Sequence, residues 1–80
     1  MRNITYAILE ERYAFGDRTR ISYGIVAYSN VYHDGSATIV ASVHDITSNK
    51  ESLARLVDNC NRLKLSTTHL HDVVEDFLSY

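Results

Sequence analysis

The 80-residue sequence contains no proline, no tryptophan and only one cysteine, Cys60. A single cysteine cannot form an internal disulfide, and no group of cysteine and histidine residues has the spacing of a structural zinc site. A chain of this length buries only about 60% of the surface that it exposes when unfolded, so its stability is expected to be marginal. We therefore expect self-association, a common way for small domains to gain stability.

The sequence also lacks an excess of basic charge and a long hydrophobic run. Eight lysine and arginine residues are outnumbered by ten acidic residues, which gives a net charge of -2. Nucleic acids and anionic membranes are bound by dense basic surfaces, so this composition argues against both kinds of partner. No apolar stretch reaches the length of a signal peptide or membrane span. We expect a cytoplasmic protein, and the unpaired cysteine agrees with this location.

Three segments alternate between apolar and other residues with a period of two, which is typical of β-strands. They cover about residues 3–13, 20–31 and 37–45. The connections contain Gly16-Asp17 and His33-Asp34-Gly35, and both have the composition of turns. Consecutive strands with short connections are antiparallel neighbours, so the sequence predicts a three-stranded meander.

The register of these strands follows because directly opposed residues lie on the same face of a sheet. A two-residue first turn places Ile8 opposite Ile25. If the second turn had two residues, the apolar residues of the second and third strands would lie on opposite faces of the sheet. A three-residue loop at 33–35 instead places Ile25 opposite Val43, with Ile39 on the same face as Val43. We prefer the three-residue loop.

The last third of the sequence predicts two amphipathic helices, at about 49–63 and 67–79. Ser48 with Glu51 forms the pattern of a capping box, and Ser66 is a suitable N-cap for the second helix. The two apolar stripes consist of Leu53, Leu56, Val57, Cys60 and Leu63, and of Leu70, Val73, Val74, Phe77 and Leu78. The expected fold is a single α+β domain over 1–80, of order β-β-β-α-α, in which a helical hairpin packs on one face of the antiparallel meander.

Three segments of the sequence resemble those of a protein family. They are Tyr23-Gly24-Ile25, Asp45-Ile46-Thr47-Ser48 and His69-Leu70-x-Asp72-Val73-Val74-Glu75-Asp76-Phe77-Leu78. The pattern is similar to that of short proteins of Gram-positive anaerobic bacteria that are classed as a domain of unknown function. The resemblance spans most of the chain. It implies no activity, because the motifs are largely core and cap positions.

The densest group of candidate metal ligands lies at the start of the second predicted helix. It contains His69, His71, Asp72 and Glu75, with Asp76 close by. At helical spacing, His71 and Glu75 can face one ion, whereas the two histidines point about 200° apart. An acidic solvated face near the helix N-terminus is the simpler interpretation. We therefore predict no metal and no other cofactor, and keep a small-ligand or metal-binding domain as the alternative function.

The remaining candidates for catalysis have structural explanations. The pair His-Asp occurs at His33-Asp34, His44-Asp45 and His71-Asp72, in a turn, at a strand end and on a helix. We interpret this repetition as coincidence. Cys60 lies in an apolar helical stripe, where burial raises the pKa of a thiol and makes it inert. No nucleophile motif or phosphate-binding glycine loop is present, so we predict that the protein is not an enzyme.

The sheet face away from the helices is the most informative surface. It is expected to carry Thr5, Ala7, Leu9, Ser22, Gly24, Val26, Tyr28, Thr38, Val40 and Ser42. A solvated sheet face normally carries charged or strongly polar residues, and the centre of this face has none. Six tyrosines suggest RNA stacking as a further alternative, but the arginines cluster near one turn. We predict a small protein-interaction or regulatory module that forms a homodimer through Leu9, Gly24, Val26, Tyr28 and Val40, with a strand edge as the alternative contact.

Overall fold

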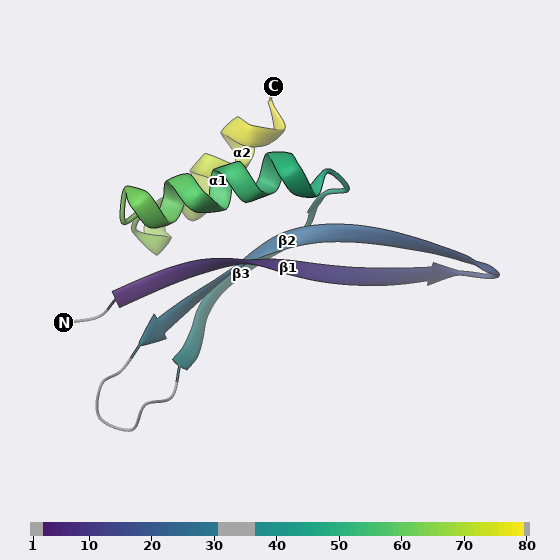
Figure 1. Cartoon of the computed structure of the whole chain (residues 1–80), viewed down its shortest axis with the longest axis horizontal. Helices are drawn as coiled ribbons and strands as arrows, with labels where there is room; N and C mark the ends of the chain where they lie inside the picture. The colour runs from purple at the N-terminus through teal and green to yellow at the C-terminus, as the bar shows by residue number, and fades with distance from the viewer. Residues whose placement is uncertain (1–2, 31–36, 80) are drawn as a thin grey trace.

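The computed structural model describes residues 3–30 and 37–79 (Figure 1). The strands β1 (Asn3–Phe15), β2 (Arg18–Asn30) and β3 (Ala37–Thr47) form an antiparallel sheet in the order β1-β2-β3. The helices α1 (Lys50–Arg62) and α2 (Leu70–Leu78) follow, and a short 3-10 helix, η1 (Thr67–His69), precedes α2. Both helices cover the same face of the sheet, which confirms the predicted β-β-β-α-α fold.

The strand register agrees with the sequence pattern over most of the sheet. The two-residue turn at Gly16-Asp17 places Ile8 opposite Ile25, as predicted. Gly16 has a φ of 62°, a conformation that glycine adopts without steric cost. Ile25 in turn lies opposite Val43, which is the register that we expected from a three-residue loop. The loop itself, at 33–35, lies outside the described residues.

A bulge in β3 corrects the predicted position of Ile39. Ala27 lies opposite Ala41 but Tyr28 lies opposite Ile39, so Val40 is an extra residue in β3. On the N-terminal side of Val40, the odd-numbered residue Ile39 lies on the open face of the sheet, whereas Ala41 and Val43 lie on the face that the helices cover. Ile39 therefore shares the open face with Tyr28 instead of joining the core, and it is 59% exposed.

A second irregularity in β3 lies opposite Gly24. Ile25 pairs with Val43 and Tyr23 pairs with Thr47, so residues 44–46 together face Gly24. A Cβ atom at Gly24 would overlap the carbonyl oxygen of Val43 and lie 3.1 Å from the Cα of His44. This close approach of β3 explains why a central strand contains glycine here.

The hydrophobic core lies between the sheet and the helices. Helix α1 packs on β1 and β2, and α2 packs on β3. The buried core residues are Tyr6, Ile25, Ala27, Ile46, Leu53, Val57, Cys60, Leu70 and Val74. Leu63 and Leu78 end the predicted stripes but are 72% and 57% exposed, because they lie at the C-terminal ends of the two helices.

The first helix begins one residue later than the predicted capping box requires. Asn49, not Ser48, is the N-cap, and its Oδ1 accepts a hydrogen bond from the Ser52 N–H at 3.1 Å. Asparagine is as good an N-cap as serine, and the Asn49 N–H is itself held by Thr47 Oγ1 at 3.1 Å. Ser66 does act as an N-cap, but it caps η1.

Asn61 of α1 binds the outer edge of β1. Its Oδ1 accepts a hydrogen bond from the Tyr6 N–H at 2.7 Å, and its Nδ2 donates to the Tyr6 carbonyl at 2.9 Å. The hydroxyl of Tyr6 donates to the Leu65 carbonyl at 2.6 Å. The Asn61 amide therefore takes the place that a peptide group of a fourth strand would occupy.

The β1–β2 hairpin extends beyond the helical layer (Figure 1). In the described part of the chain, β3 pairs with β2 no nearer to the turn than Tyr23. Residues 11–22 therefore form a two-stranded projection, which we call the arm. Every residue from 14 to 21 is exposed.

Candidate functional site

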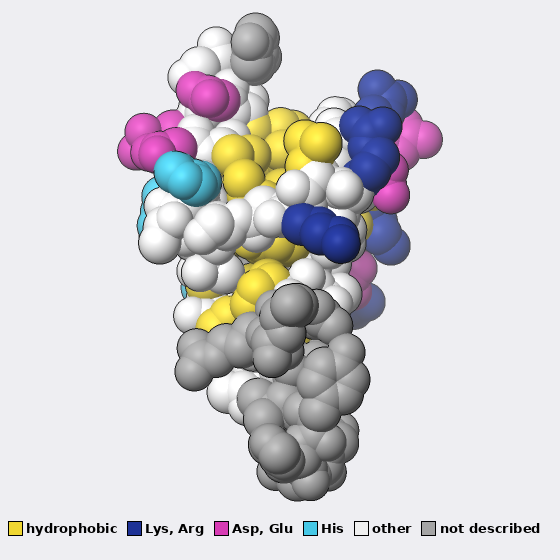
Figure 2. Space-filling model, turned by 90° about the vertical axis from the view of Figure 1, so that its left-hand side faces the viewer, with side chains coloured by type: hydrophobic (Ala, Val, Ile, Leu, Met, Phe, Trp, Pro, Cys, Tyr) yellow, Lys and Arg dark blue, Asp and Glu magenta, His cyan; other side chains and the backbone are white. Residues whose placement is uncertain are grey.

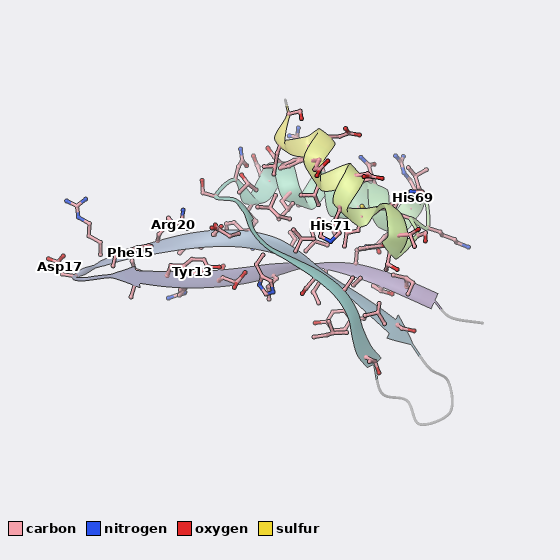
Figure 3. All side chains as sticks on the ribbon, turned by 180° about the vertical axis from the view of Figure 1, so that it is seen from behind. Tyr13, Phe15, Asp17, Arg20, His69 and His71 are labelled. Atoms are coloured by element: carbon pink, nitrogen blue, oxygen red, sulfur yellow. The ribbon has the colours of Figure 1, made fainter. Side chains whose placement is uncertain are left out.

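A group of polar side chains occupies the open face of the sheet, where the sequence indicated an uncharged centre. We call it the polar cluster, and it consists of Glu11, Tyr13, Arg20, Ser22, Ser42, His44 and Asp45. All three strands contribute to it. Figure 3 shows Tyr13 and Arg20 on the arm, with Asp17 at its tip.

His44 connects the two outer strands of the sheet. Its Nδ1 lies 2.9 Å from Glu11 Oε1 on β1, and its Nε2 lies 3.3 Å from Ser42 Oγ on β3. The intervening strand, β2, presents Gly24 at this level. Because glycine has no side chain and lets β3 approach closely, the imidazole can reach across β2 to Glu11.

Asp45 connects β3 to β2. It has a φ of 53°, which places it in the left-handed region that aspartate tolerates better than most residues. Its Oδ1 accepts a hydrogen bond from Ser22 Oγ at 2.5 Å, and Arg20 Nη2 lies 3.1 and 3.3 Å from its two oxygens. The hydrogen bond from Ser22, together with the positive charge of Arg20, lowers the pKa of the Asp45 carboxyl.

Arg20 also organises the aromatic side chains of the arm. Its guanidinium carbon lies 5.4 Å from the ring centre of Tyr13 and 5.9 Å from that of Phe15, within the range of cation–π contacts. Loss of solvation, followed by a hydrogen bond with Glu11, raises the pKa of Tyr13. The arm is joined to β3 through Arg20 and Ser22, which bind Asp45, and through Glu11, which binds His44.

Ser42, His44 and Glu11 follow the hydroxyl–imidazole–carboxylate order of serine hydrolases. Such chemistry also needs oxyanion-stabilising donors and a site that excludes water. The side chain of His44 is 56% exposed. Both ring nitrogens of His44 are within hydrogen-bonding distance of other side chains of the open face.

The structure covers much of the predicted interface within a single chain. Val26 is 4% exposed, and Gly24 is buried. The expectation that these two residues form an exposed centre is therefore wrong. Leu9 and Tyr28 are half-buried, and Val40 is 43% exposed.

The candidate metal ligands at the start of the second helix remain exposed. His69 ends η1, whereas His71, Asp72 and Glu75 belong to α2. Acidic side chains and histidine gather on the α2 side of the helical layer (Figure 2). Within residues 3–30 and 37–79, no three His, Cys, Asp or Glu residues are close enough together to hold a metal ion.

Cys60 is buried, as predicted from the helical stripe. It is 3% exposed, and this burial raises the pKa of its thiol. It lines a small apolar hollow of about 70 Å³ between the helices, together with Leu56, Asn59, Leu63, Leu65 and Val73.

The sequence pattern did not predict the polar cluster, because the cluster depends on the second bulge of β3, at residues 44–46 opposite Gly24. The alternation of β1 and β2 already places Glu11 beside Ser22, and Tyr13 beside Arg20. That signal was available in the sequence. The contribution of β3 was not, because the usual period of two does not reveal that Asp45 turns toward Ser22.

A model of a family of unknown function, DUF6514, matches residues 2–80. This match agrees with the resemblance to a domain of unknown function. The comparisons with curated proteins and with solved structures gave no match. Among the described helices, none has the length and apolar character needed to cross a membrane.

Proposed function

We propose that this chain, which belongs to the family of unknown function DUF6514, is a non-enzymatic protein-interaction module that forms a homodimer through its open sheet face. The observation that carries this proposal is the arm, which presents Phe15 with 62% of its surface exposed. Aromatic residues are enriched in protein–protein interfaces, and covering the ring of Phe15 with a partner would remove apolar surface from water. We place the protein in the cytoplasm because its one cysteine is unpaired.

The arm is held in one conformation by contacts of its own. A two-stranded hairpin without further support is only marginally stable in water. Here Arg20 stacks on Tyr13 and Phe15 and also binds Asp45, which anchors the arm to β3. A surface that is already ordered loses less conformational entropy on binding. Tyrosine and arginine are also enriched among the residues that dominate binding energy.

The edges of the sheet are less suited to association than its open face. Asn61 occupies the backbone groups of β1 at Tyr6. Bulges at Val40 and at 44–46 interrupt β3, the other edge strand. Bulges disturb the regular row of N–H and C=O groups that an added strand would need. We therefore favour contact through the face over contact through an edge.

Light scattering over micromolar to millimolar concentrations tests the proposal. We expect a particle of twice the 9.1 kDa chain mass for the wild type. Phe15→Ser should weaken association at least tenfold while circular dichroism shows an unchanged fold. Leu63→Ser is the matched control, because Leu63 is equally apolar and 72% exposed but lies at the end of α1. A wild type that stays monomeric throughout would contradict the proposal.

A further inference from the structure

The exposed apolar side chains of the open face lie at its two ends. Phe15 marks the tip of the arm. Ile39 and Val40, which are 59% and 43% exposed, mark the opposite end, where Ile39 pairs with Tyr28. The polar cluster lies between these two ends. Consider a second copy whose open face meets that of the first. If the two copies are related by a 180° rotation about an axis that lies between the faces and is perpendicular to the strands, the arm tip of each copy lies over the opposite apolar end of the other.

We infer that two copies pack open face to open face about such a two-fold axis, so that each arm lies over the Thr5–Tyr28–Ile39 end of its partner. This inference rests on the proposed self-association and adds its geometry. The strands of the two copies would run in opposite directions, as in an isologous contact in which each copy uses the same surface. Helices α1 and α2 would remain on the outer sides of the dimer.

The charges of the face are compatible with a second copy as the occupant. Glu11 and Asp45 supply two negative charges, and Arg18 and Arg20 supply two positive charges. Two such faces therefore meet without net repulsion. Asp45 is already bound by Ser22 and Arg20, and Glu11 by His44. Covering these groups leaves no carboxylate without a partner, which is the condition for burying charge at tolerable cost.

The dimensions of the face allow a dimer contact of modest size. Strands β1 and β2 have 13 residues each and are about 43 Å long at about 3.3 Å per residue, and β3 adds a third strand only beside Tyr23–Asn30. At about 4.8 Å per strand the projected area is roughly 500 Å², so two faces together reach roughly 1,000 Å², the lower bound for a specific interface. Two twisted sheets pack face to face at about -30°, which this arrangement permits.

Cross-linking between single-cysteine substitutions tests the geometry. Arg18 and Thr5 are both exposed, and both lie on the open face at opposite ends. Their replacement leaves the apolar residues of the proposed contact intact, and the native Cys60 is buried. Arg18→Cys and Thr5→Cys proteins are mixed, equilibrated and treated with a short bis-maleimide. We expect a linked dimer in the mixture and at least fivefold less product from either protein alone.

The controls separate this geometry from self-association itself. Asp58→Cys introduces a thiol on an exposed position of α1, on the outer side of the proposed dimer, and should give no linked product. Efficient cross-linking of the Arg18→Cys protein to itself would show that the two arms meet tip to tip. This result would overturn the inferred geometry but would still support self-association. Linkage through Asp58→Cys would overturn it as well. A monomer in light scattering would remove the self-association on which the inference rests.

Discussion

The side-chain amide of Asn61 binds both backbone polar groups of Tyr6, across 55 residues of sequence. A carboxamide carries a donor and an acceptor side by side, as a peptide group does. It can therefore end the hydrogen-bond ladder of β1 while it holds α1 against the sheet. The same contact keeps this part of the edge from pairing with another chain.

Replacing Asn61 with aspartate should destabilise the domain by about 1–3 kcal/mol, measured by urea unfolding. The carboxylate still accepts from the Tyr6 N–H, but it cannot donate to the Tyr6 carbonyl. Asn59→Asp is the control, because the Asn59 side chain binds Arg62 on the exposed side of α1. Its effect should stay within about 0.5 kcal/mol. Equal losses in the two variants would argue against the role of the Asn61 contact.

Gly24→Ala should lower stability by about 2 kcal/mol or more, because the added methyl group overlaps the Val43 carbonyl. The bulge must then move, and the bridge from His44 to Glu11 should break. Thermal unfolding measures the loss, and the NMR signals of the His44 ring report the bridge. Gly16→Asn is the control, because its site is open and asparagine tolerates a positive φ. A melting shift below two degrees for Gly24→Ala would mean that the bulge adapts readily.

Lys64→Gly should stabilise the domain by about 0.5–1 kcal/mol. Lys64 follows the C-terminus of α1 with a φ of 52°, and Leu65 N–H donates to the Cys60 carbonyl at 3.0 Å to close the helix end. Glycine is the usual residue at such a position because it has no Cβ to clash. Lys64→Ala removes the side chain but keeps the Cβ, so it should give no gain. Urea unfolding of both variants would refute the explanation if alanine stabilised as much as glycine.

The contribution of Asp45 to stability should depend on acidic pH. The hydrogen bond from Ser22 and the charge of Arg20 lower its pKa in the folded state below the ordinary value of 3.8. The contribution is therefore fully present above the unfolded-state pKa and is lost as the pH falls through the folded-state pKa. Asp45→Asn should be less stable than the wild type at pH 7, and this difference should shrink below about pH 4. Urea unfolding at pH 7, 5 and 3 measures it, and Asp17→Asn in the exposed turn is the control. A difference that stays constant over this range would contradict the assignment.

Cys60 should react with a thiol reagent only when the protein unfolds. Its site is 3% exposed and excludes both the reagent and the thiolate form. Ellman's reagent should find no reactive thiol in native buffer and one per chain in concentrated urea. Stoichiometric reaction within seconds in native buffer would instead indicate a reactive cysteine.

Local patterns in the sequence determined the elements, their order and most of the register. The pairing of Ile8 with Ile25 follows from the turn at Gly16-Asp17 and the alternation on either side of it. The helical stripe that buries Leu53 and Cys60 follows from spacing alone. These features depend on residues that are near one another in the chain, so periodicity and turn chemistry are sufficient to predict them.

Contacts between distant segments decided the rest. The missing side chain of Gly24 lets β3 bulge, and this bulge brings His44 to Glu11 and Asp45 to Arg20. All three strands had to be placed side by side before that arrangement existed. The burial of Val26 is a further example, because the alternating pattern places it on the open face but it is only 4% exposed. A bulge places an extra residue in one strand, opposite a single residue of its neighbour. An analysis that assumes a fixed period of two cannot predict where this extra residue lies.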